Sequence, residues 1–222
     1  MKKIAVLTLI LALSLCLCFA TAENEGTTVY VTISDGDLEV VRYAVTLSDT
    51  DGDEKLTIND ALYLAHEAAF EGGAEAGYAT AETQYGLSLS KLWGIENGGS
   101  YGYYVNNVGA YSPVDELKDG DELVAFVYTD LATWSDSFCY FDKTETEAGE
   151  VTLKLSMVGW DANFMPVELP VAGATITIDG EATEYVTGED GTVTFTVSDT
   201  ATLISASSET LTLVPPVCVV VK

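Results

Sequence analysis

The sequence predicts a mainly β protein with one or two helices, in which an α+β domain is followed by a small all-β sandwich domain. Three observations predict this class. Runs that alternate β-branched or aromatic residues with polar ones recur along the chain, one run alone has clear helical spacing, and the last third alternates with no helical run. The length of 222 residues allows two domains.

Residues 1–22 are predicted to be a signal peptide. Two lysines precede an apolar run from residue 4 to residue 19, and Ala20-Thr21-Ala22 is a small-residue cleavage pattern. No later run approaches the ~20 apolar residues that cross a bilayer. We therefore expect an exported protein, secreted or associated with the cell surface, that is monomeric and has no membrane span.

The charge of the chain restricts the classes of partner that it can bind. The sequence carries 35 acidic and 9 basic residues, which gives a formal net charge of −26. Nucleic acid and anionic lipid bind through lysine and arginine, so this charge disfavours both. A cation or a cationic partner fits better, and the sequence leaves open whether the partner is a protein, a glycan or a small molecule.

The first domain is predicted to begin with a hairpin and a helix. Residues 27–34 and 38–47 alternate as strands do, and Ser34-Asp35-Gly36-Asp37 provides the turn between them. A helix is predicted over residues 58–70, because apolar residues recur there at helical spacing and Gly72-Gly73 follows.

The rest of the first domain, which is predicted to span residues 23–142, has weaker signals. The glycine-rich stretch 74–100 predicts a long functional loop with one short helix near residues 89–92. Two further strands are predicted at 101–106 and 122–129, and a third segment, 136–142, can add another.

The second domain is predicted to be a β-sandwich over residues 150–222. Residues 143–149 contain no large apolar side chain, which predicts a linker. Beyond the linker, short alternating strands are separated by turn signals at Asp179-Gly180 and Asp190-Gly191. The predicted strands lie at 151–158, 174–179, 192–197, 201–205 and 218–221.

An acidic stretch between the hairpin and the helix has the spacing of a calcium-binding loop. Counted from Asp49, oxygen donors stand at the first, third, fifth, ninth and twelfth positions, and a calcium ion takes 6 to 8 oxygen ligands at such positions. The seventh position contributes its backbone carbonyl. The predicted ligands are Asp49, Asp51, Asp53, Lys55, Thr57 and Asp60.

Two residues depart from the usual pattern of such loops. Glu54 stands at the sixth position, where a glycine normally adopts a left-handed conformation, and the same conformation costs glutamate roughly 1 to 2 kcal/mol. The twelfth position is Asp60, which is shorter than the usual glutamate. The alternative is a solvated acidic turn in which Thr57 and Asp60 form a capping box for the helix.

The stretch DTDGDEKLTINDAL resembles a single dockerin-type calcium repeat. This resemblance implies a dockerin-like, EF-hand-like loop and helix over residues 48–70, with aspartate at the twelfth position as in dockerins. A cellulosomal dockerin has two such repeats, and the sequence shows one. Cohesin binding is therefore not expected.

The flanks of this loop resemble β-grasp domains related to the C-terminal domain of transcobalamin and intrinsic factor, as found in exported proteins of Gram-positive bacteria. The resemblance covers residues 27–142 and is carried by the order of elements, by the sequence GYYVNN and by Asp119-Gly120-Asp121. It implies that corrinoid (cobalamin) contacts come from Trp93, Tyr101, Tyr103 and Asn106. Alternating tyrosines that pack on a sheet are the other explanation.

The second domain resembles transthyretin-like or carboxypeptidase-regulatory-like sandwiches. Pro170-Val171-Ala172-Gly173 before a strand and Thr187-Gly188-Glu189-Asp190-Gly191 before the next carry this resemblance, which implies a spacer. Cys139 and Cys218, the two cysteines beyond the predicted signal peptide, form either a disulfide or two buried thiols.

Enzymatic activity is not expected. His66 is the only histidine, and the predicted helix lacks the second histidine of a zinc-protease pair. We expect this histidine to be partly solvated. The sequence therefore predicts a non-enzymatic binding or surface-interaction protein with a structural calcium site; a corrinoid-binding protein is the alternative, and a secreted carbohydrate-active hydrolase ranks third.

Overall fold

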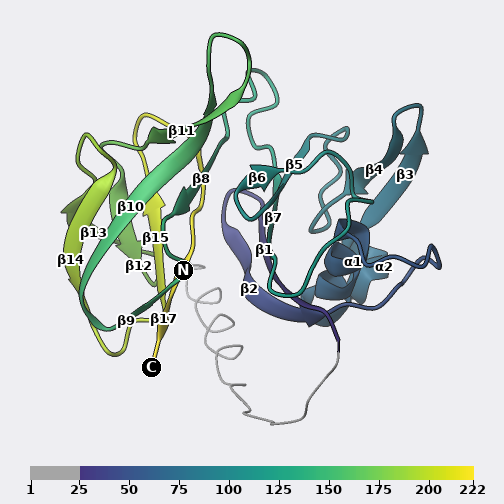
Figure 1. Cartoon of the computed structure of the whole chain (residues 1–222), viewed down its shortest axis with the longest axis horizontal. Coiled ribbons are helices and arrows are strands. Elements are labelled where there is room, and N and C mark those ends of the chain that lie inside the picture. The colour runs from purple at the N-terminus through teal and green to yellow at the C-terminus, as the bar shows by residue number, and fades with distance from the viewer. Residues whose placement is uncertain (1–25) are drawn as a thin grey trace, which may run out of the picture.

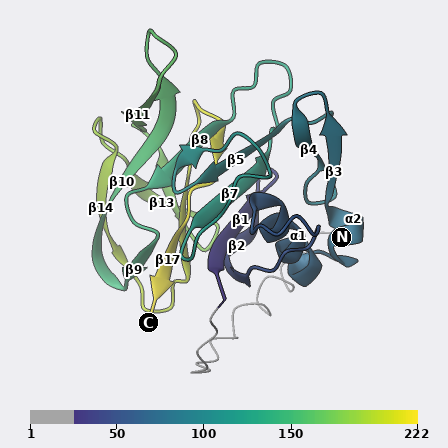
Figure 2. The same ribbon diagram turned by 45° about the vertical axis from the view of Figure 1, so that its right-hand side comes forward.

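The computed structural model describes residues 26–222, and the predicted signal peptide at 1–22 lies outside this part of the chain. Two bodies lie side by side, with the N-terminal one on the right and the C-terminal one on the left in Figure 1. Figure 2 shows the same arrangement after a turn. Each body has its own hydrophobic core, and the prediction of a mainly β protein with one or two helices is confirmed.

The first domain is built on one mixed five-stranded sheet. Its strand order is β2-β1-β7-β5-β6, in which β7 runs parallel to β1 and the other neighbours are antiparallel. The hairpin of β1 and β2 lies at one edge, a helix follows it in the sequence, and the last strand returns beside the first and parallel to it. The strands are β1 (Thr28–Ser34), β2 (Leu38–Thr46), β5 (Tyr101–Val105), β6 (Val108–Gly109) and β7 (Glu122–Val127).

Helix α1 (Ile58–Ala69) covers the face of this sheet that is turned away from the second domain (Figure 1). Its apolar side chains at Ile58, Leu62 and Ala65 are fully buried in the core that the helix forms with β1 and β2. The helix begins with the predicted capping box, in which Thr57 is the N-cap and Asp60 the third residue. It ends at Phe70, and a short helix α2 (Gly73–Gly77) follows the two glycines.

The stretch that was predicted as a long loop contains a hairpin of its own. Strands β3 (Ala79–Thr83) and β4 (Gly86–Lys91) pair antiparallel and stand apart from the main sheet (Figure 1). The short helix predicted near residues 89–92 is therefore wrong, because most of those residues belong to β4. Strand β3 (ATAET) has no large apolar side chain, so its half of the hairpin lacks the pattern that signals a strand, although Leu87 and Leu89 alternate with serine in β4.

The second domain is a sandwich of two sheets. The long strand β10 (Gly149–Trp160) is central to one sheet, where it pairs with β8, β11 and β14. The other sheet has the order β13-β12-β15-β17-β9. The remaining strands are β8 (Ser137–Phe141), β9 (Glu145–Glu147), β11 (Pro166–Pro170), β12 (Thr175–Ile178), β13 (Glu181–Val186), β14 (Thr192–Val197), β15 (Leu203–Ser207), β16 (Leu213–Val214) and β17 (Cys218–Val221).

The boundary between the domains differs from the prediction at 142. Strand β8 pairs with β10 and β16, so it belongs to the second domain. The predicted linker 143–149 contains β9, which pairs with β17. Small polar residues made this segment look like a linker, whereas its backbone completes the edge of a sheet. The connection between the two bodies is instead the stretch between β7 and β8, residues 128–136.

Aromatic side chains fill the contact between the two domains. Tyr104 and Phe126 lie on the face of the first sheet opposite α1, and Phe138 comes from β8. The Tyr104 and Phe138 rings stack with their centroids 3.7 Å apart. Gly102 leaves the space on β5 that the Phe126 ring fills. The domains thus share a third, smaller apolar cluster.

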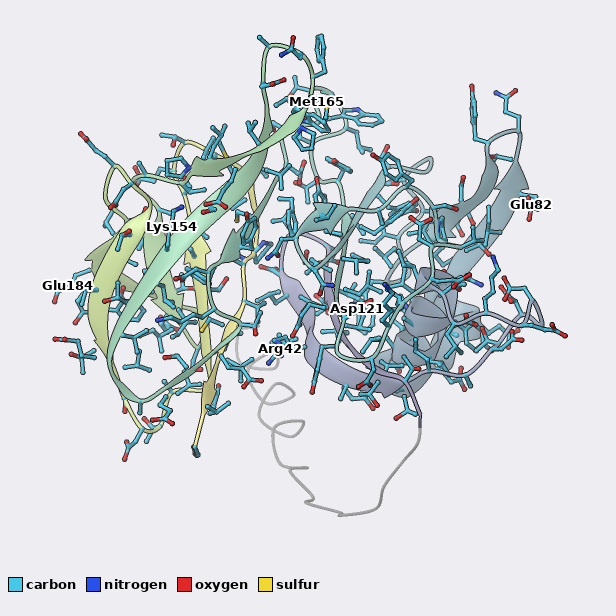
Figure 3. The ribbon with its side chains drawn as sticks, viewed as in Figure 1. Arg42, Glu82, Asp121, Lys154, Met165 and Glu184 are labelled. Atoms are coloured by element: carbon cyan, nitrogen blue, oxygen red, sulfur yellow. The ribbon has the colours of Figure 1, made fainter. Side chains whose placement is uncertain are left out.

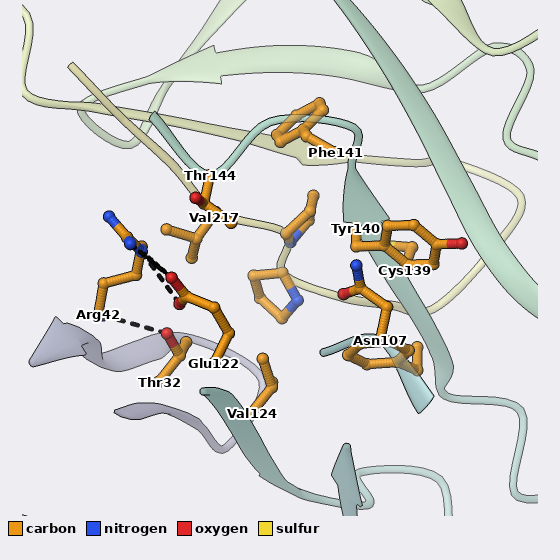
Figure 4. A pocket seen from close by; sticks show the side chains of 13 residues that line it. Thr32, Arg42, Asn107, Glu122, Val124, Cys139, Tyr140, Phe141, Thr144 and Val217 are labelled. Carbon is orange, nitrogen blue, oxygen red and sulfur yellow. Dashed lines mark hydrogen bonds and ion pairs between the residues drawn. The ribbon is translucent and has the colours of Figure 1, made fainter. Parts of the chain in front are cut away.

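Arg42, the only arginine in the sequence, also links the two domains. Its guanidinium group forms a forked ion pair with Glu122 of β7, with a shortest distance of 2.5 Å, and a second ion pair of 2.5 Å with Glu145 of β9. Figure 4 shows Arg42 and Glu122 beside a cavity of about 40 Å³ between the domains. Arg42 adopts a φ of 40° at an irregularity in β2.

Both cysteines of the described chain are buried and unbridged. Cys139 lies in β8 and Cys218 in β17, on the two sheets of the sandwich, and the sulfur of Cys139 lies 3.1 Å from the carbonyl oxygen of Val214. Burial raises the pKa of the Cys218 thiol to about 11. Of the two alternatives, the structure contains the buried thiols. No helix within residues 26–222 has the length and apolar character to span a membrane.

Candidate functional site

Three aspartates gather on the loop between β2 and α1. Asp49, Asp51 and Asp53 are exposed, and each places one carboxylate oxygen within 4.8 Å of the others. Within residues 26–222, this is the one group of three or more acidic, histidine or cysteine side chains close enough to share an ion. Carboxylate oxygens are the ligands that hard cations prefer, so the group is suited to hold a metal ion.

Asp49 shapes the loop through hydrogen bonds to the backbone. Its two carboxylate oxygens accept from the backbone amides of Gly52 at 2.6 Å and of Glu54 at 3.0 Å. These hydrogen bonds, with the one from Gly52 as the largest cause, lower the pKa of Asp49 below its ordinary value. The hydrogen bonds thus favour the ionised form of the carboxylate, which is the form that binds a metal ion.

Glu54 adopts the left-handed conformation that the sixth position of such a loop needs. Its φ is 65°, in the region where glycine is normally found. The loop thus turns at the position predicted from the sequence. Lys55 follows with its backbone amide bonded to Asp53 and its ammonium 3.5 Å from Glu116, and both of these side chains are exposed.

Asp60, the predicted ligand at the twelfth position, forms hydrogen bonds inside the protein. Its carboxylate is fully buried and does not belong to the group of three. One oxygen accepts from the amide and hydroxyl of Thr50, and the other accepts from the amide and hydroxyl of Thr57. Asp60 and Thr57 therefore close the loop onto the start of α1, while the exposed ligand positions lie on the preceding turn.

A buried hydrogen-bond chain connects the acidic group to the core, and sequence reasoning missed it. Asn59 donates from its side-chain amide to Asp51 at 2.8 Å, and it accepts a hydrogen bond from the hydroxyl of Tyr78 at 2.8 Å. Tyr78 is 8% exposed. The sequence places Asn59 next to Asp60 of the capping box. It does not show that Tyr78, which follows α2, would form a hydrogen bond with Asn59.

His66 is buried, and the expectation that it is partly solvated is wrong. Its Nδ1 lies 2.6 Å from the carbonyl oxygen of Leu62, and its Nε2 accepts a hydrogen bond from the backbone amide of Trp93 at 3.0 Å. These partners define the neutral tautomer with the proton on Nδ1. The ring also lies among Phe70, Tyr78 and Trp93. The loop returning from β4 covers the histidine, which the periodicity of α1 does not reveal.

The residues proposed for corrinoid contacts have other partners in the structure. The Trp93 indole donates to Glu39 at 2.8 Å, and the Tyr101 hydroxyl lies 2.8 Å from the carbonyl oxygen of Ile95. Tyr103 packs against the core on the α1 side of the sheet. Asn106 occupies the β5–β6 turn with a φ of 50° and bonds to Asp121 and to the backbone amide of Glu122. Trp93, Tyr101 and Tyr103 thus lie on one side of the sheet and Asn106 at its end.

An open cleft of about 560 Å³ lies between the β3–β4 hairpin and the loop at Gly98-Gly99, and none of the four proposed corrinoid residues lines it. Comparison with known proteins adds no assignment: no family model, curated protein or solved structure matches the chain.

The buried histidine predicts a pH dependence of stability. Burial lowers the pKa of His66 from 6.5 to about 4 in the folded protein. The unfolded chain therefore binds a proton more readily, and the stability that is fully present above pH 6.5 is lost as the pH falls toward 4. The loss amounts to about 3 kcal/mol, at 1.36 kcal/mol for each pKa unit. Urea unfolding between pH 7 and pH 4 measures it.

A His66→Gln variant is the control for this prediction. It lacks the titrating ring but keeps every carboxylate, so its pH dependence reports the acids alone. The wild type should lose more stability than the variant over this interval. Equal slopes for the two proteins would show that His66 binds a proton as readily in the folded state as in the unfolded state, and would contradict the lowered pKa.

Proposed function

We propose that the protein is an exported, non-enzymatic binding protein whose first domain is stabilised by a calcium ion on the loop between β2 and α1. The observation that carries the metal site is the convergence of the carboxylates of Asp49, Asp51 and Asp53. These three would hold the ion, and water and loop carbonyls would supply the remaining oxygens of a calcium shell.

The chemistry of the loop favours calcium over softer metals. The group contains carboxylates alone, whereas zinc and copper sites use histidine or cysteine. The single histidine and both cysteines of residues 26–222 are buried elsewhere. The strong negative charge of the chain also raises the local concentration of cations.

Calcium at this site would act on folding through the start of α1. The same loop carries the capping box, and Asn59 joins Asp51 to the buried Tyr78. An ion that neutralises three close carboxylates removes their mutual repulsion and stabilises the state in which they converge. A free calcium concentration of about 100 times the Kd would stabilise the native state by about 2.7 kcal/mol.

An Asp49→Ala variant is expected to lose the rise in melting temperature that calcium produces in the wild type. Asp49 supplies one ligand and also the hydrogen bonds that shape the loop. Thermal unfolding followed by circular dichroism, with calcium and with a chelator, measures the rise. Glu184→Ala, an acidic change on β13 in the second domain, is the matched control and should keep the full rise.

An unchanged rise in the Asp49→Ala variant would refute the ligand assignment. A rise that magnesium reproduces at the same concentration would refute calcium selectivity. None of the described contacts favours corrinoid binding or hydrolysis over this function.

A further inference from the structure

Large apolar side chains are exposed at one end of the second domain. Trp134 is 59% exposed, Trp160 65% and Phe164 84%, and Leu131 and Met165 beside them in sequence are also exposed. They come from two segments, the connection between β7 and β8, and the end of β10 with the turn that follows it. Both segments lie at the upper end of the molecule in Figures 1 and 2, and Figure 3 labels Met165 there. We call these five residues the aromatic end.

Strand pairing brings the two segments to the same end. Strand β8 runs antiparallel to β10 with Cys139 opposite Met157, so the chain just before β8 lies near the end of β10. Residues two apart on a strand share a face. Trp160 therefore follows Val158 on the face that carries the cluster between the domains. The Trp134 ring lies against Tyr128 of that cluster, with the ring centroids 5.6 Å apart and the planes tilted by 38°. The aromatic end continues this cluster into solvent.

Aspartates hold the first segment in a defined shape. Asp136 accepts hydrogen bonds from the amides of Thr129 and Asp130 at 2.9 Å each. Asp130 in turn accepts from the hydroxyls of Thr133 and Ser135 and from two backbone amides of the turn. Trp134 adopts a φ of 56°, which is unfavourable for a bulky residue. The exposed ring of Trp134 is therefore carried by a backbone segment that these hydrogen bonds hold in place.

A similar arrangement holds the second segment. Asp161 accepts from the backbone amides of Asn163 at 2.8 Å and Met165 at 2.9 Å. Phe164, at the tip, adopts a φ of 60° and is almost fully exposed. Two segments distant in sequence thus each display an aromatic ring on an unfavourable, tightly bonded backbone. Such strain persists at sites where it serves recognition, and exposed aromatic groups mark protein interaction surfaces.

The charges around the aromatic end are negative. Asp130, Asp136, Asp161 and Glu168 lie on the same two segments and on β11. The one lysine on this part of β10, Lys154, is 2.6 Å from Glu168 and so is already paired. Glu168 is therefore neutralised within the chain, and a partner that approaches these rings meets the carboxylates of Asp130, Asp136 and Asp161. Lysine and arginine side chains satisfy both features, because they pair with carboxylates and bind to the faces of aromatic rings.

We propose that the aromatic end is the docking surface for a protein segment that carries lysine or arginine side chains. A second copy of this chain would bring like charges together, and an anionic bilayer would be repelled by the net charge of −26. This inference names the partner chemistry of the proposed binding function, on which it rests. It does not depend on calcium, because the aromatic end lies on the second domain and on the connection to it.

The test uses oligolysine and oligoarginine peptides as probes for the purified protein. Binding is measured by fluorescence anisotropy of labelled peptides at physiological salt. The Trp134→Ala/Trp160→Ala double variant keeps the charge of the wild type, and we expect its affinity to fall about tenfold, since each cation–π contact contributes about 0.5–1 kcal/mol. Tyr85→Ala/Tyr111→Ala removes two exposed aromatic rings from the first domain and should bind as the wild type does.

Equal affinity of the double variant and the wild type would show that the peptides bind to diffuse negative charge, and would overturn the proposal. Absence of peptide binding to the wild type would also overturn it, as would preferential binding to phosphatidylcholine vesicles or to neutral oligosaccharides. The Asp49→Ala variant separates the two proposals. If it binds the peptides normally but shows no calcium response, peptide binding at the aromatic end is independent of the metal loop.

Discussion

Replacing Asp60 with asparagine is expected to lower the free energy of unfolding by about 3 kcal/mol, even without calcium. Asp60 is fully buried, and its two carboxylate oxygens accept four hydrogen bonds from Thr50 and Thr57. An asparagine amide turns an NH₂ group toward two of these donors. A buried backbone amide then loses its acceptor, which is more costly than the loss of an exposed hydrogen bond.

Urea unfolding in the presence of a chelator measures this change. Asp53→Asn is the matched control, because it removes the same charge from an exposed carboxylate of the same loop that accepts one backbone hydrogen bond. The control should lie within about 0.5 kcal/mol of the wild type. If Asp60→Asn were as stable as Asp53→Asn, the hydrogen bonds of the buried Asp60 carboxylate to Thr50 and Thr57 would not contribute to stability as expected.

The second large effect is expected at Arg42. An Arg42→Ala variant should lose about 2–3 kcal/mol of stability, because it leaves Glu122 in the domain contact without its partner. The side chains of Arg42 and Glu122 are 10% and 25% exposed, so water screens this pair weakly. Glu145 is 50% exposed, and its pair with Arg42 should contribute less than about 1 kcal/mol.

Two further variants separate the contributions to this contact. Arg42→Lys keeps the charge but cannot form the forked pair with Glu122, and it should recover about half of the loss. Glu145→Gln should change stability by less than about 1 kcal/mol. Urea unfolding of the three variants gives the comparison. Because Arg42→Ala removes both ion pairs, a loss in Glu145→Gln as large as that in Arg42→Ala would mean that the pair between the domains, and not the pair with Glu122, dominates.

The elements with strong local signals could be predicted from the sequence. The β1–β2 hairpin has alternating side chains and an Asp-Gly turn, and α1 has both a capping box and an apolar stripe, so local chemistry and the final fold agree there. The left-handed turn at Glu54 was also predictable, because the spacing of the aspartates on either side requires it.

The errors arose where distant segments decide the structure. Thr144 and its neighbours look like a linker until the last strand of the chain pairs with them. Leu89 and Leu92 suggested a short helix, but β3 pairs with the segment before Lys91 and makes it a strand. His66 was expected to be partly solvated because the loop that buries it, around Trp93, comes only after α2 and the β3–β4 hairpin in the sequence. None of these partners can be inferred from a window of local sequence.

The candidate metal loop could be predicted only in part, because some of its features are local in the sequence and others depend on distant segments. The spacing of the three exposed aspartates is local, and the structure brings them together. Asp60 satisfies two patterns at once, the twelfth position of a loop and the third residue of a helix cap, and its burial in the structure follows the second. The chain from Asp51 through Asn59 to Tyr78 depends on α2, for which the sequence has no helical period.

The pairing of the last strands has a consequence for synthesis of the chain. All strands of the first domain are complete once Val127 has been made, whereas β8 and β9 must wait for β16 and β17. A nascent or truncated chain that stops before residue 213 would therefore carry a first domain followed by three strands, β8, β9 and β15, each with an unpaired edge. Unpaired strand edges template aggregation, so intact C-terminal residues protect the whole polypeptide from misassembly.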